Sequence, residues 1–253
     1  MADFTKHIVE LETCESTNDV AMEMVRLGCP HGTAVITQIQ TRGKGRLGRA
    51  WESFRGNLAM SVVIRPHQLP TYLAPRLVML SAHAVILALR ARGVETWIKW
   101  PNDILIKKAD SVEKLGRFRK LGGILLELSS ANNMIEAAVI GIGLNLKTPA
   151  KEEVGKIIPQ MGFVDVPARE FADELLKQLE KHVARPIDDA FFNEVLTDIK
   201  HNLAFMNEEV VVDNGSTPLR GIVSDISHDC ALMIKDESGV IKSIYVGDVF
   251  RAA

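Results

Sequence analysis

The chain has 253 residues, with 30 Lys and Arg against 32 Asp and Glu, and 47% of its residues are hydrophobic. This composition indicates a soluble globular protein with one large domain, or one large domain and a small companion. A net charge of −2 excludes a globally basic nucleic-acid binder. The longest uncharged apolar stretch, Leu77–Leu89, is shorter than the roughly 18 residues of a membrane span, so we expect no membrane segment.

Alternating and β-branched stretches predict strands, and stretches with a 3.6-residue apolar period predict helices. In chain order we expect strands at Phe4–Glu12, Thr33–Gln40, Leu58–Arg65, two pieces within Thr96–Ile106, Leu121–Leu128 and Ile135–Leu146. The expected helices are Val20–Leu27, a mostly buried Pro75–Arg92, Val166–Val183 and Ile187–Leu203.

The pattern changes after Phe205. Short strand-like stretches follow, at Val210–Val212, Gly221–Ile226, Ala231–Lys235 and Val240–Tyr245, as in a small β-barrel. We therefore predict an α+β protein with two domains. Residues 1–205 would form a mixed β-sheet with helices packed on it, and residues 206–253 a small all-β domain.

The N-terminus carries acidic residues and no apolar signal core. Cys14, Cys29 and Cys230 are far apart with no CxxC spacing, which is typical of free thiols in a reducing compartment. The seven histidines are dispersed without zinc spacing. We expect a cytoplasmic protein.

A glycine-rich loop, Gly43–Gly48, fits the pattern G-x-G-x-x-G after a predicted strand. A dinucleotide site would also need a following helix and an acid about 20 residues later. Here Gly56-Asn57 interrupts the chain, and no acid lies between Glu52 and Glu95. Kinase motifs and a P-loop lysine are missing as well, so these three nucleotide-binding classes are excluded.

The same loop holds four cations, Arg42, Lys44, Arg46 and Arg49, with no acid between them. Its glycines let the backbone approach a ligand closely and expose N–H donors. This combination suits a phosphate, or a carboxylate that becomes an acyl phosphate. A solvated basic turn is an equally good interpretation on charge count alone.

Four further segments are candidate ligand contacts, and each has a plain structural alternative. Lys99–Asp103 is a strand-turn or an ordinary Asn-Asp turn, and Lys120 precedes two glycines but is also typical of a surface lysine. Gly141–Asn145 places two glycines and an amide at a strand end, where glycines also serve packing. Ser16–Asp19 matches a helix capping box, which favours capping, although a helix N-terminus also offers donors to a ligand.

Taken together, these segments resemble the biotin protein ligases. The resemblance rests on Glu15–Asn18, Gln40–Trp51, Lys99–Asp103, Lys120–Glu127 and Gly141–Asn145. It implies a mixed sheet followed by an SH3-like β-barrel. It also implies that biotin and ATP, with Mg²⁺, give biotinyl-5′-adenylate, from which biotin passes to a lysine of a biotin carboxyl carrier protein.

The resemblance also assigns roles. The implied catalytic residues are Lys120, Arg46 and Asp103, of which Asp103 would help to deprotonate the incoming lysine. The implied biotin contacts are Ser16, Thr17, Asn18, Gln40, Gly43, Lys44, Gly45, Arg46 and Lys120. The implied ATP contacts are Arg46, Arg49, Trp51, Lys99, Asn102, Lys120 and Asn145, while the metal ligands stay open.

Two departures from the family pattern stand out. Lys44 replaces the usual first arginine and so lacks its bidentate fork. The segment Lys107–Lys120 is longer than the equivalent connection and holds six cations and two acids. The catalytic pattern starts at Ser16, which implies a ligase without direct operator binding, and the family often forms homodimers.

Two rival functions remain to be weighed. A lipoate ligase would run the same adenylation chemistry, but its Arg-Arg-x-Ser-Gly-Gly-Gly stretch is missing. A non-catalytic nucleic-acid-binding module would use Arg42–Arg49 for phosphates. The near-neutral charge and the lack of interleaved aromatic residues disfavour that module.

Overall fold

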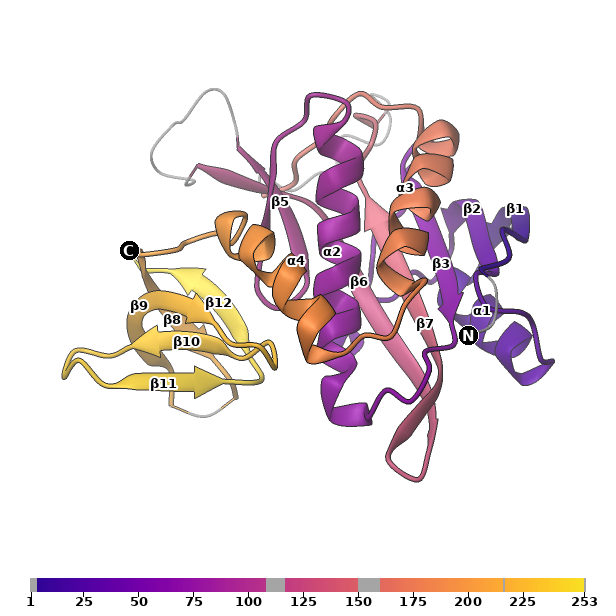
Figure 1. The fold of residues 1–253 in the computed structure, drawn as a ribbon. Helices are drawn as coiled ribbons and strands as arrows, with labels where there is room; N and C mark the ends of the chain where they lie inside the picture. The colour runs from indigo at the N-terminus through magenta and orange to yellow at the C-terminus, as the bar shows by residue number, and fades with distance from the viewer. Residues whose placement is uncertain (1–3, 108–116, 150–159, 216, 253) are drawn as a thin grey trace.

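The structure, a computed structural model, describes residues 4–107, 117–149, 160–215 and 217–252. Most of the segment Lys107–Lys120, which the sequence singles out, lies outside these residues. The centre of the larger domain is a seven-stranded mixed sheet (Figure 1). Its strands, in spatial order, are β1 (Ile8–Cys14), β2 (Ala34–Gln40), β3 (Leu58–Ile64), β7 (Met134–Leu144), β6 (Phe118–Ala131), β5 (Asp103–Lys107) and β4 (Thr96–Lys99). Only the β1–β2 pair is parallel.

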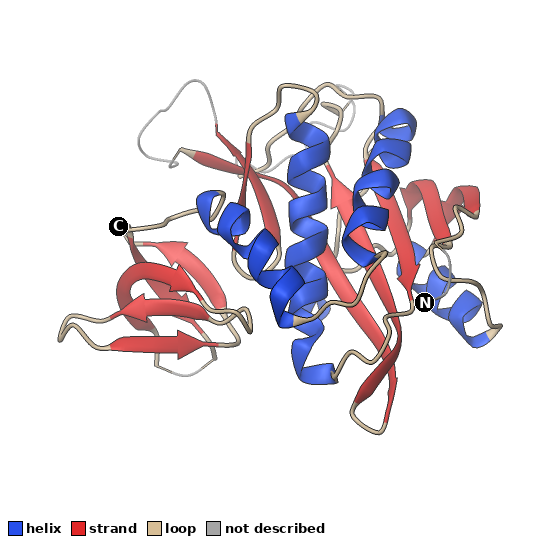
Figure 2. Cartoon of the chain, viewed as in Figure 1, coloured by secondary structure: helices blue, strands red, loops and turns tan. Residues whose placement is uncertain are grey.

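Helices cover both faces of this sheet. Helix α2 (Ala74–Arg90) lies across one face beside α3 (Ala168–Val183) and α4 (Asp189–His201) (Figure 2). Helix α1 (Thr17–Arg26) packs on the opposite face, where Ala21 meets Val35, Val63 and Val139 in a separate apolar cluster. Successive strand residues point to opposite faces, which is why β2, β3 and β7 contribute to both clusters.

Helix α2 carries apolar residues on all its sides, and most of its residues are buried in the fold. With the short 3₁₀ turn Thr71–Leu73, it forms a stretch, Thr71–Arg90, that is long and apolar enough to cross a membrane. This stretch includes Arg76 and Arg90, so its longest uncharged part is still Leu77–Leu89. An apolar 18-residue window within it is 72% buried inside the fold, as in the core helix of a globular domain.

The smaller domain is a five-stranded antiparallel sheet. Its strands, in spatial order, are β11 (Ile241–Ile244), β10 (Leu232–Lys235), β9 (Leu219–Ile226), β8 (Glu209–Asp213) and β12 (Asp248–Arg251). Among the described residues β11 and β12 are edges, so this SH3-like sheet is open and not the closed barrel that we expected. The α+β fold with a mixed sheet and a small all-β domain is confirmed.

The two domains are tied together by buried polar contacts. The Trp100 indole N–H donates to the Cys230 carbonyl at 2.9 Å. Arg76, only 1% exposed on α2, donates to Asp189 and to the His228 carbonyl, and its guanidinium lies over the Phe192 ring. A buried arginine is stable only when it is paired in this way.

Candidate active site

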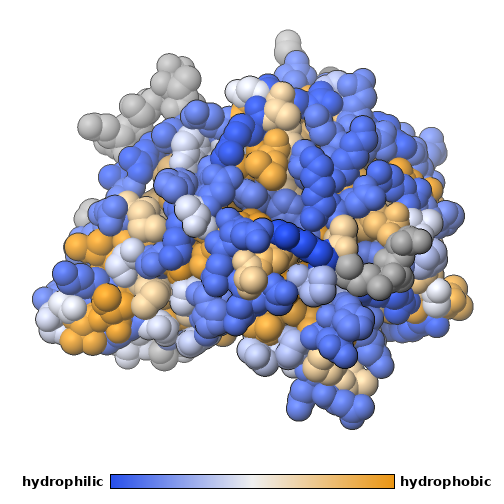
Figure 3. All heavy atoms as spheres, in the orientation of Figure 1, coloured by the Kyte–Doolittle hydropathy of each residue, from blue (hydrophilic) through white to orange (hydrophobic). Residues whose placement is uncertain are grey.

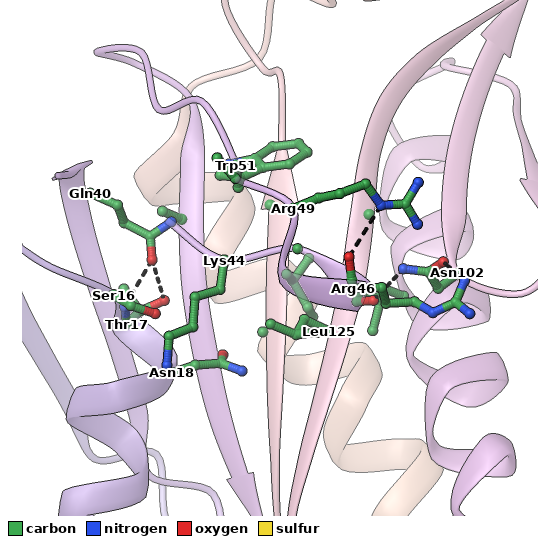
Figure 4. A pocket seen from close by; sticks show the side chains of 18 of the residues that line it. Ser16, Thr17, Asn18, Gln40, Lys44, Arg46, Arg49, Trp51, Asn102 and Leu125 are labelled. Atoms are coloured by element: carbon green, nitrogen blue, oxygen red, sulfur yellow. Dashed lines mark hydrogen bonds between the residues drawn. The ribbon is translucent and has the colours of Figure 1, made fainter. Parts of the chain in front are cut away.

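A pocket of about 130 Å³ lies where the loop 41–51 crosses the centre of the sheet (Figure 4). Its walls come from the start of α1, from the loop, and from β3, β5, β6 and β7. The lining includes Ser16, Thr17, Asn18, Gln40, Lys44, Gly45, Arg46, Arg49, Trp51, Asn102, Asp103 and Lys120. The pocket therefore brings together segments that are more than 100 residues apart in the sequence.

One end of the pocket is a buried polar network. Gln40 Oε1 accepts from the Thr17 backbone N–H at 2.8 Å and from Thr17 Oγ1 at 3.1 Å. Ser61 Oγ lies 2.7 Å from Thr17 Oγ1 and 2.6 Å from Asn18 Oδ1, while Asn18 Nδ2 donates to Glu127 Oε2 at 2.7 Å. Each side chain is held in one orientation, so the network can present fixed donors and acceptors to a polar ligand.

This network also corrects the capping prediction. Ser16 occupies the N-cap position of α1, but its side chain makes no cap hydrogen bond. The first free N–H of the helix, that of Thr17, is instead satisfied by Gln40 from β2. The Ser16–Asp19 box is thus replaced by a tertiary contact that belongs to the pocket.

The other end of the pocket is cationic, and each cation already has a partner among the described residues. Lys120 Nζ lies 2.7 Å from Asp103 Oδ1, whereas Lys44 reaches the polar network and pairs with Asp19 of α1 (Figure 4). Arg46 donates to Asn102 Oδ1 at 3.1 Å. Asp103 is the only acid among the described lining residues, so the lining itself is cationic, although Asp19 offsets one of its charges from outside the lining.

A carboxylate of the smaller domain also reaches these cations. Asp248, at the start of β12, lies 3.5 Å from Arg46 NH1 and 3.1 Å from Arg49 NH1. The loop and the smaller domain are therefore joined at the pocket by ionic contacts. An entering anion would compete with this carboxylate for the two arginines.

Backbone hydrogen bonds fold the glycine loop into a tight turn. The Gly45 N–H donates to the Arg49 carbonyl at 2.7 Å, and the Trp51 N–H to the Gly43 carbonyl at 2.9 Å. A Cβ on Gly43 would lie 2.5 Å from the Trp51 carbonyl oxygen, so this position needs glycine. The turn continues into the short 3₁₀ segment Arg46–Gly48, not into the long helix of a dinucleotide-binding motif.

Three predicted contacts lie outside the pocket lining. Gly43 supports the turn of the loop, and Lys99 lies behind the pocket, 3.7 Å from Asp103 Oδ2. Asn145 is buried, and its amide bonds to Asn57 and to the Lys120 carbonyl. The roles assigned to all the predicted site residues stay predictions.

The structure also gives contacts to residues for which the sequence predicted no role. Gly143 lies against the Trp51 ring, and a Cβ there would approach the ring to 2.6 Å. Ser61 and Glu127 orient Asn18 through the hydrogen bonds of the polar network. Ser61 has a visible signal, because it is the only polar residue in the fully buried strand β3. The apolar wall is formed by Ala59, Met60, Ile124, Leu125 and Ile142.

Comparison with known proteins identifies the family of this chain. The model of the Biotin/lipoate A/B protein ligase family matches residues 11–145, more than half of the chain. This chain belongs to that family. The model of the Biotin protein ligase C terminal domain matches residues 205–251. The expected family is therefore confirmed.

Individual relatives match this chain over different fractions of its length. The Biotin--[acetyl-CoA-carboxylase] ligase of Paracoccus denitrificans is 28% identical over 90% of this chain and 94% of its own length. The Bifunctional ligase/repressor BirA of Bacillus subtilis is 36% identical over 56% of this chain. That match spans only 41% of the Bacillus protein.

Solved structures have the same fold. The biotin protein ligase from Aquifex aeolicus in complex with biotin and ATP matches with a TM-score of 0.76 and 25% identity, over 98% of this chain and all of that one. The ligase from Leishmania major in complex with biotinyl-5-AMP matches with a TM-score of 0.60 and 21% identity, over 96% and 100%.

Proposed function

We propose that this chain is an ATP-dependent biotin protein ligase. It would activate biotin as biotinyl-5′-adenylate and transfer it to a lysine of a biotin carboxyl carrier protein. The observation that carries the proposal is the pocket itself, whose lining combines a buried polar network with four cations and one acid. Such a pocket suits a molecule with one uncharged polar end and one carboxylate that must meet a triphosphate.

In the first step a biotin carboxylate oxygen attacks the α-phosphorus of ATP, and pyrophosphate leaves. Two anions have to approach each other, so the repulsion must be offset by fixed positive charge. Arg46, Arg49 and Lys120 line the pocket for this task, and their orientation is already set by Asn102, Asp248 and Asp103. A preorganised donor of this kind contributes about 100- to 1000-fold in rate.

The uncharged end of biotin, its ureido group, would lie against the polar network. Thr17, Asn18 and Gln40 offer hydroxyl and amide groups whose orientation is fixed by Ser61 and Glu127. A buried polar group left unpaired costs about 1–3 kcal/mol, so a buried ureido group needs hydrogen-bond partners, which these side chains would supply. Trp51, which packs on Gly143, would cover the bound nucleotide.

In the second step the lysine amine of the carrier attacks the acyl carbon of the mixed anhydride. An amide bond forms, the bond to the phosphate oxygen breaks, and AMP leaves. We assign Asp103 to this step as the residue that helps to deprotonate the lysine. Its support is its place in the pocket lining, next to Lys120.

The pocket fits Mg²⁺ only as part of the ATP complex. The described residues contain no group of three His, Cys, Asp or Glu side chains that could hold a metal ion. The one lining acid, Asp103, faces two lysines. Mg²⁺ is commonly bound through substrate phosphates with few protein ligands, and there it neutralises phosphate charge.

We also propose that the protein acts in the cytoplasm as a homodimer and does not bind an operator directly. The location is supported by the free cysteines, the dimer by the family resemblance, and the lack of operator binding by the net charge of −2. Sedimentation analysis with and without biotin and ATP tests the dimer. A gel-shift assay with the operator of a biotin synthesis gene tests the absence of direct operator binding.

The test of the activity is incubation with biotin, ATP, Mg²⁺ and a biotin-accepting carrier domain, followed by mass measurement of the carrier. We expect the mass to rise by one biotinyl group. The matched control replaces biotin with lipoate. If the carrier mass rises with lipoate and not with biotin, the chain is a lipoate ligase.

A further inference from the structure

A second cavity of about 250 Å³ adjoins the first pocket. The two share Arg46, Asn102, Ile124 and Leu125, so the inner end of the second cavity is the cationic end of the first. Of the residues assigned to biotin and ATP, only Arg46 and Asn102 also line this cavity. Its remaining wall joins α2, β6 and the smaller domain, so both domains form it.

The walls of this cavity are apolar and its rim is acidic. Val78 and Met79 of α2, Leu126 of β6 and the Trp100 ring form the sides. At the rim Tyr245 is 64% exposed, and its hydroxyl donates to Asp229 Oδ2 at 3.1 Å.

The carboxylate at the rim is ionised near neutral pH. Asp229 accepts hydrogen bonds from Ser227 and Tyr245, and these bonds hold its pKa below the ordinary value. The cavity thus has a negative rim, an apolar middle and a polar inner end beside the proposed acyl carbon.

The smaller domain also exposes apolar side chains. Val240, Ile241, Val246 and Phe250 are each more than half exposed, and orange atoms gather over this part of the molecule in Figure 3. Val246 directly follows Tyr245 of the rim, so a protein that docks on this residue would lie beside the opening.

We propose that the second cavity is the channel through which the acceptor lysine of the carrier protein reaches the adenylate. This inference rests on the proposed function. A lysine side chain has an apolar four-carbon stem and a cationic head. The stem matches Val78, Met79 and Leu126, and the head is attracted first by Asp229 at the rim.

The chemistry at the inner end balances. The lysine ammonium loses a proton with the help of Asp103 in the first pocket, its amine forms a C–N bond with the acyl carbon, and the C–O bond to the phosphate breaks. AMP leaves with that electron pair, and the second amine proton goes to solvent. Arg46 and Asn102, which lie in both cavities, would there face the departing phosphate.

The cavity walls disfavour the passage of pyrophosphate, which is released in the first step and must also leave the site. Pyrophosphate carries several negative charges, and an apolar channel with an acidic rim would repel and desolvate it. An adenine ring could occupy an apolar cavity, and that occupant makes a different prediction. If adenine or pyrophosphate used this cavity, blocking it would slow the first step.

The experiment blocks the channel and measures the two steps separately. Val78→Trp adds bulk to the wall, while Leu27→Trp adds the same bulk at an exposed and distant site. Pyrophosphate release without carrier reports the first step. Transfer of biotin from preformed adenylate to the carrier reports the second.

For Val78→Trp we expect pyrophosphate release within twofold of wild type and transfer reduced at least tenfold. Slower pyrophosphate release, or unchanged transfer, overturns the channel. If the wild-type protein forms no adenylate at all, the proposed function fails instead, so the two failures are distinct.

Two milder variants keep the test valid if the tryptophan disturbs folding. Asp229→Asn removes the charge at the rim of the cavity. Tyr245→Ala removes the aromatic ring from the same rim. The matched control is Tyr72→Ala, because Tyr72 is an exposed tyrosine outside the cavity. We expect a several-fold rise in the KM for the carrier for the two rim variants and none for Tyr72→Ala. Equal KM values for all three would overturn the proposal.

Discussion

Asp103 and Lys120 form an ion pair across β5 and β6, with Lys120 Nζ 2.7 Å from Asp103 Oδ1. The second carboxylate oxygen lies 3.7 Å from Lys99 Nζ, so one acid faces two lysines. Both lysines are partly shielded from water, which strengthens the pairing relative to a surface contact. Asp103 therefore orients Lys120 toward the pocket, whether or not it also acts as a base.

Asp103→Asn separates these two roles. Loss of the charge would leave Lys120 less well oriented, so we predict that adenylate formation without carrier slows about tenfold, the size of one charge-assisted hydrogen bond. The measurement is pyrophosphate release. Glu15→Gln, which alters an exposed pair with Arg42, is the control and should not change the rate. If Asp103→Asn slows only the transfer step, Asp103 acts as a base and does not orient Lys120 for adenylate formation.

Arg46→Ala tests the cationic end of the pocket. We predict that adenylate formation falls about 100- to 1000-fold because a donor aimed at the α-phosphate is lost. Arg42→Ala is a matched control: this residue lies in the same loop but pairs with Glu15 outside the pocket lining. Equal rates for the two variants would remove Arg46 from the mechanism.

Gly143→Ala tests the support under Trp51. The new methyl group would lie 2.6 Å from the indole, so the ring must move away. We predict a raised KM for ATP and a shifted tryptophan emission spectrum. Trp51→Phe provides the reference for a ring that is smaller but still present. An unchanged KM and spectrum would show that the ring does not depend on this contact.

Two histidines on the helices that cover the sheet make the stability of the protein depend on pH. His182 on α3 is buried, and its Nε2 lies 2.8 Å from His83 Nδ1 on α2. Burial, and then the neighbouring His83, lower the pKa of His182 to about 4. The unfolded chain, with an ordinary histidine pKa of 6.5, binds this proton more readily, so acid favours unfolding.

We therefore predict that His182 alone lowers the free energy of unfolding by about 3 kcal/mol between pH 7 and pH 4. Urea denaturation of wild type and His182→Gln over this range measures the effect. The stability of the glutamine variant should fall less steeply as the pH drops. Parallel curves for the two proteins would contradict the prediction.

The periodicity of the sequence identified most of the fold. Strands β2, β3 and β7 are recognisable because they are buried and β-branched, and α3 and α4 because each has one apolar face. Strand β12 was missed, since its four residues are too few to show a period. Whether the smaller sheet closes depends on contacts between distant strands, which local patterns do not report.

The candidate site is recognisable from its motifs, but its internal geometry is not. The family resemblance groups Lys44, Arg46 and Lys120 from sequence motifs alone. It could not show that Gln40 replaces the Ser16 cap, because that bond joins β2 to α1. Asp248 gives no sequence signal either, since its ion pairs with the loop span about 200 residues of sequence.

That carboxylate has a consequence for the ligand-free protein. Asp248 offers Arg46 and Arg49 an anion belonging to the same molecule. Asp248 of the smaller domain thus acts as the counter-ion of both arginines, and a chain cut before residue 206 would leave Arg46 and Arg49 without this carboxylate. Such a fragment should capture inorganic anions at the mouth of its own pocket, where the intact protein admits only a ligand that outcompetes Asp248.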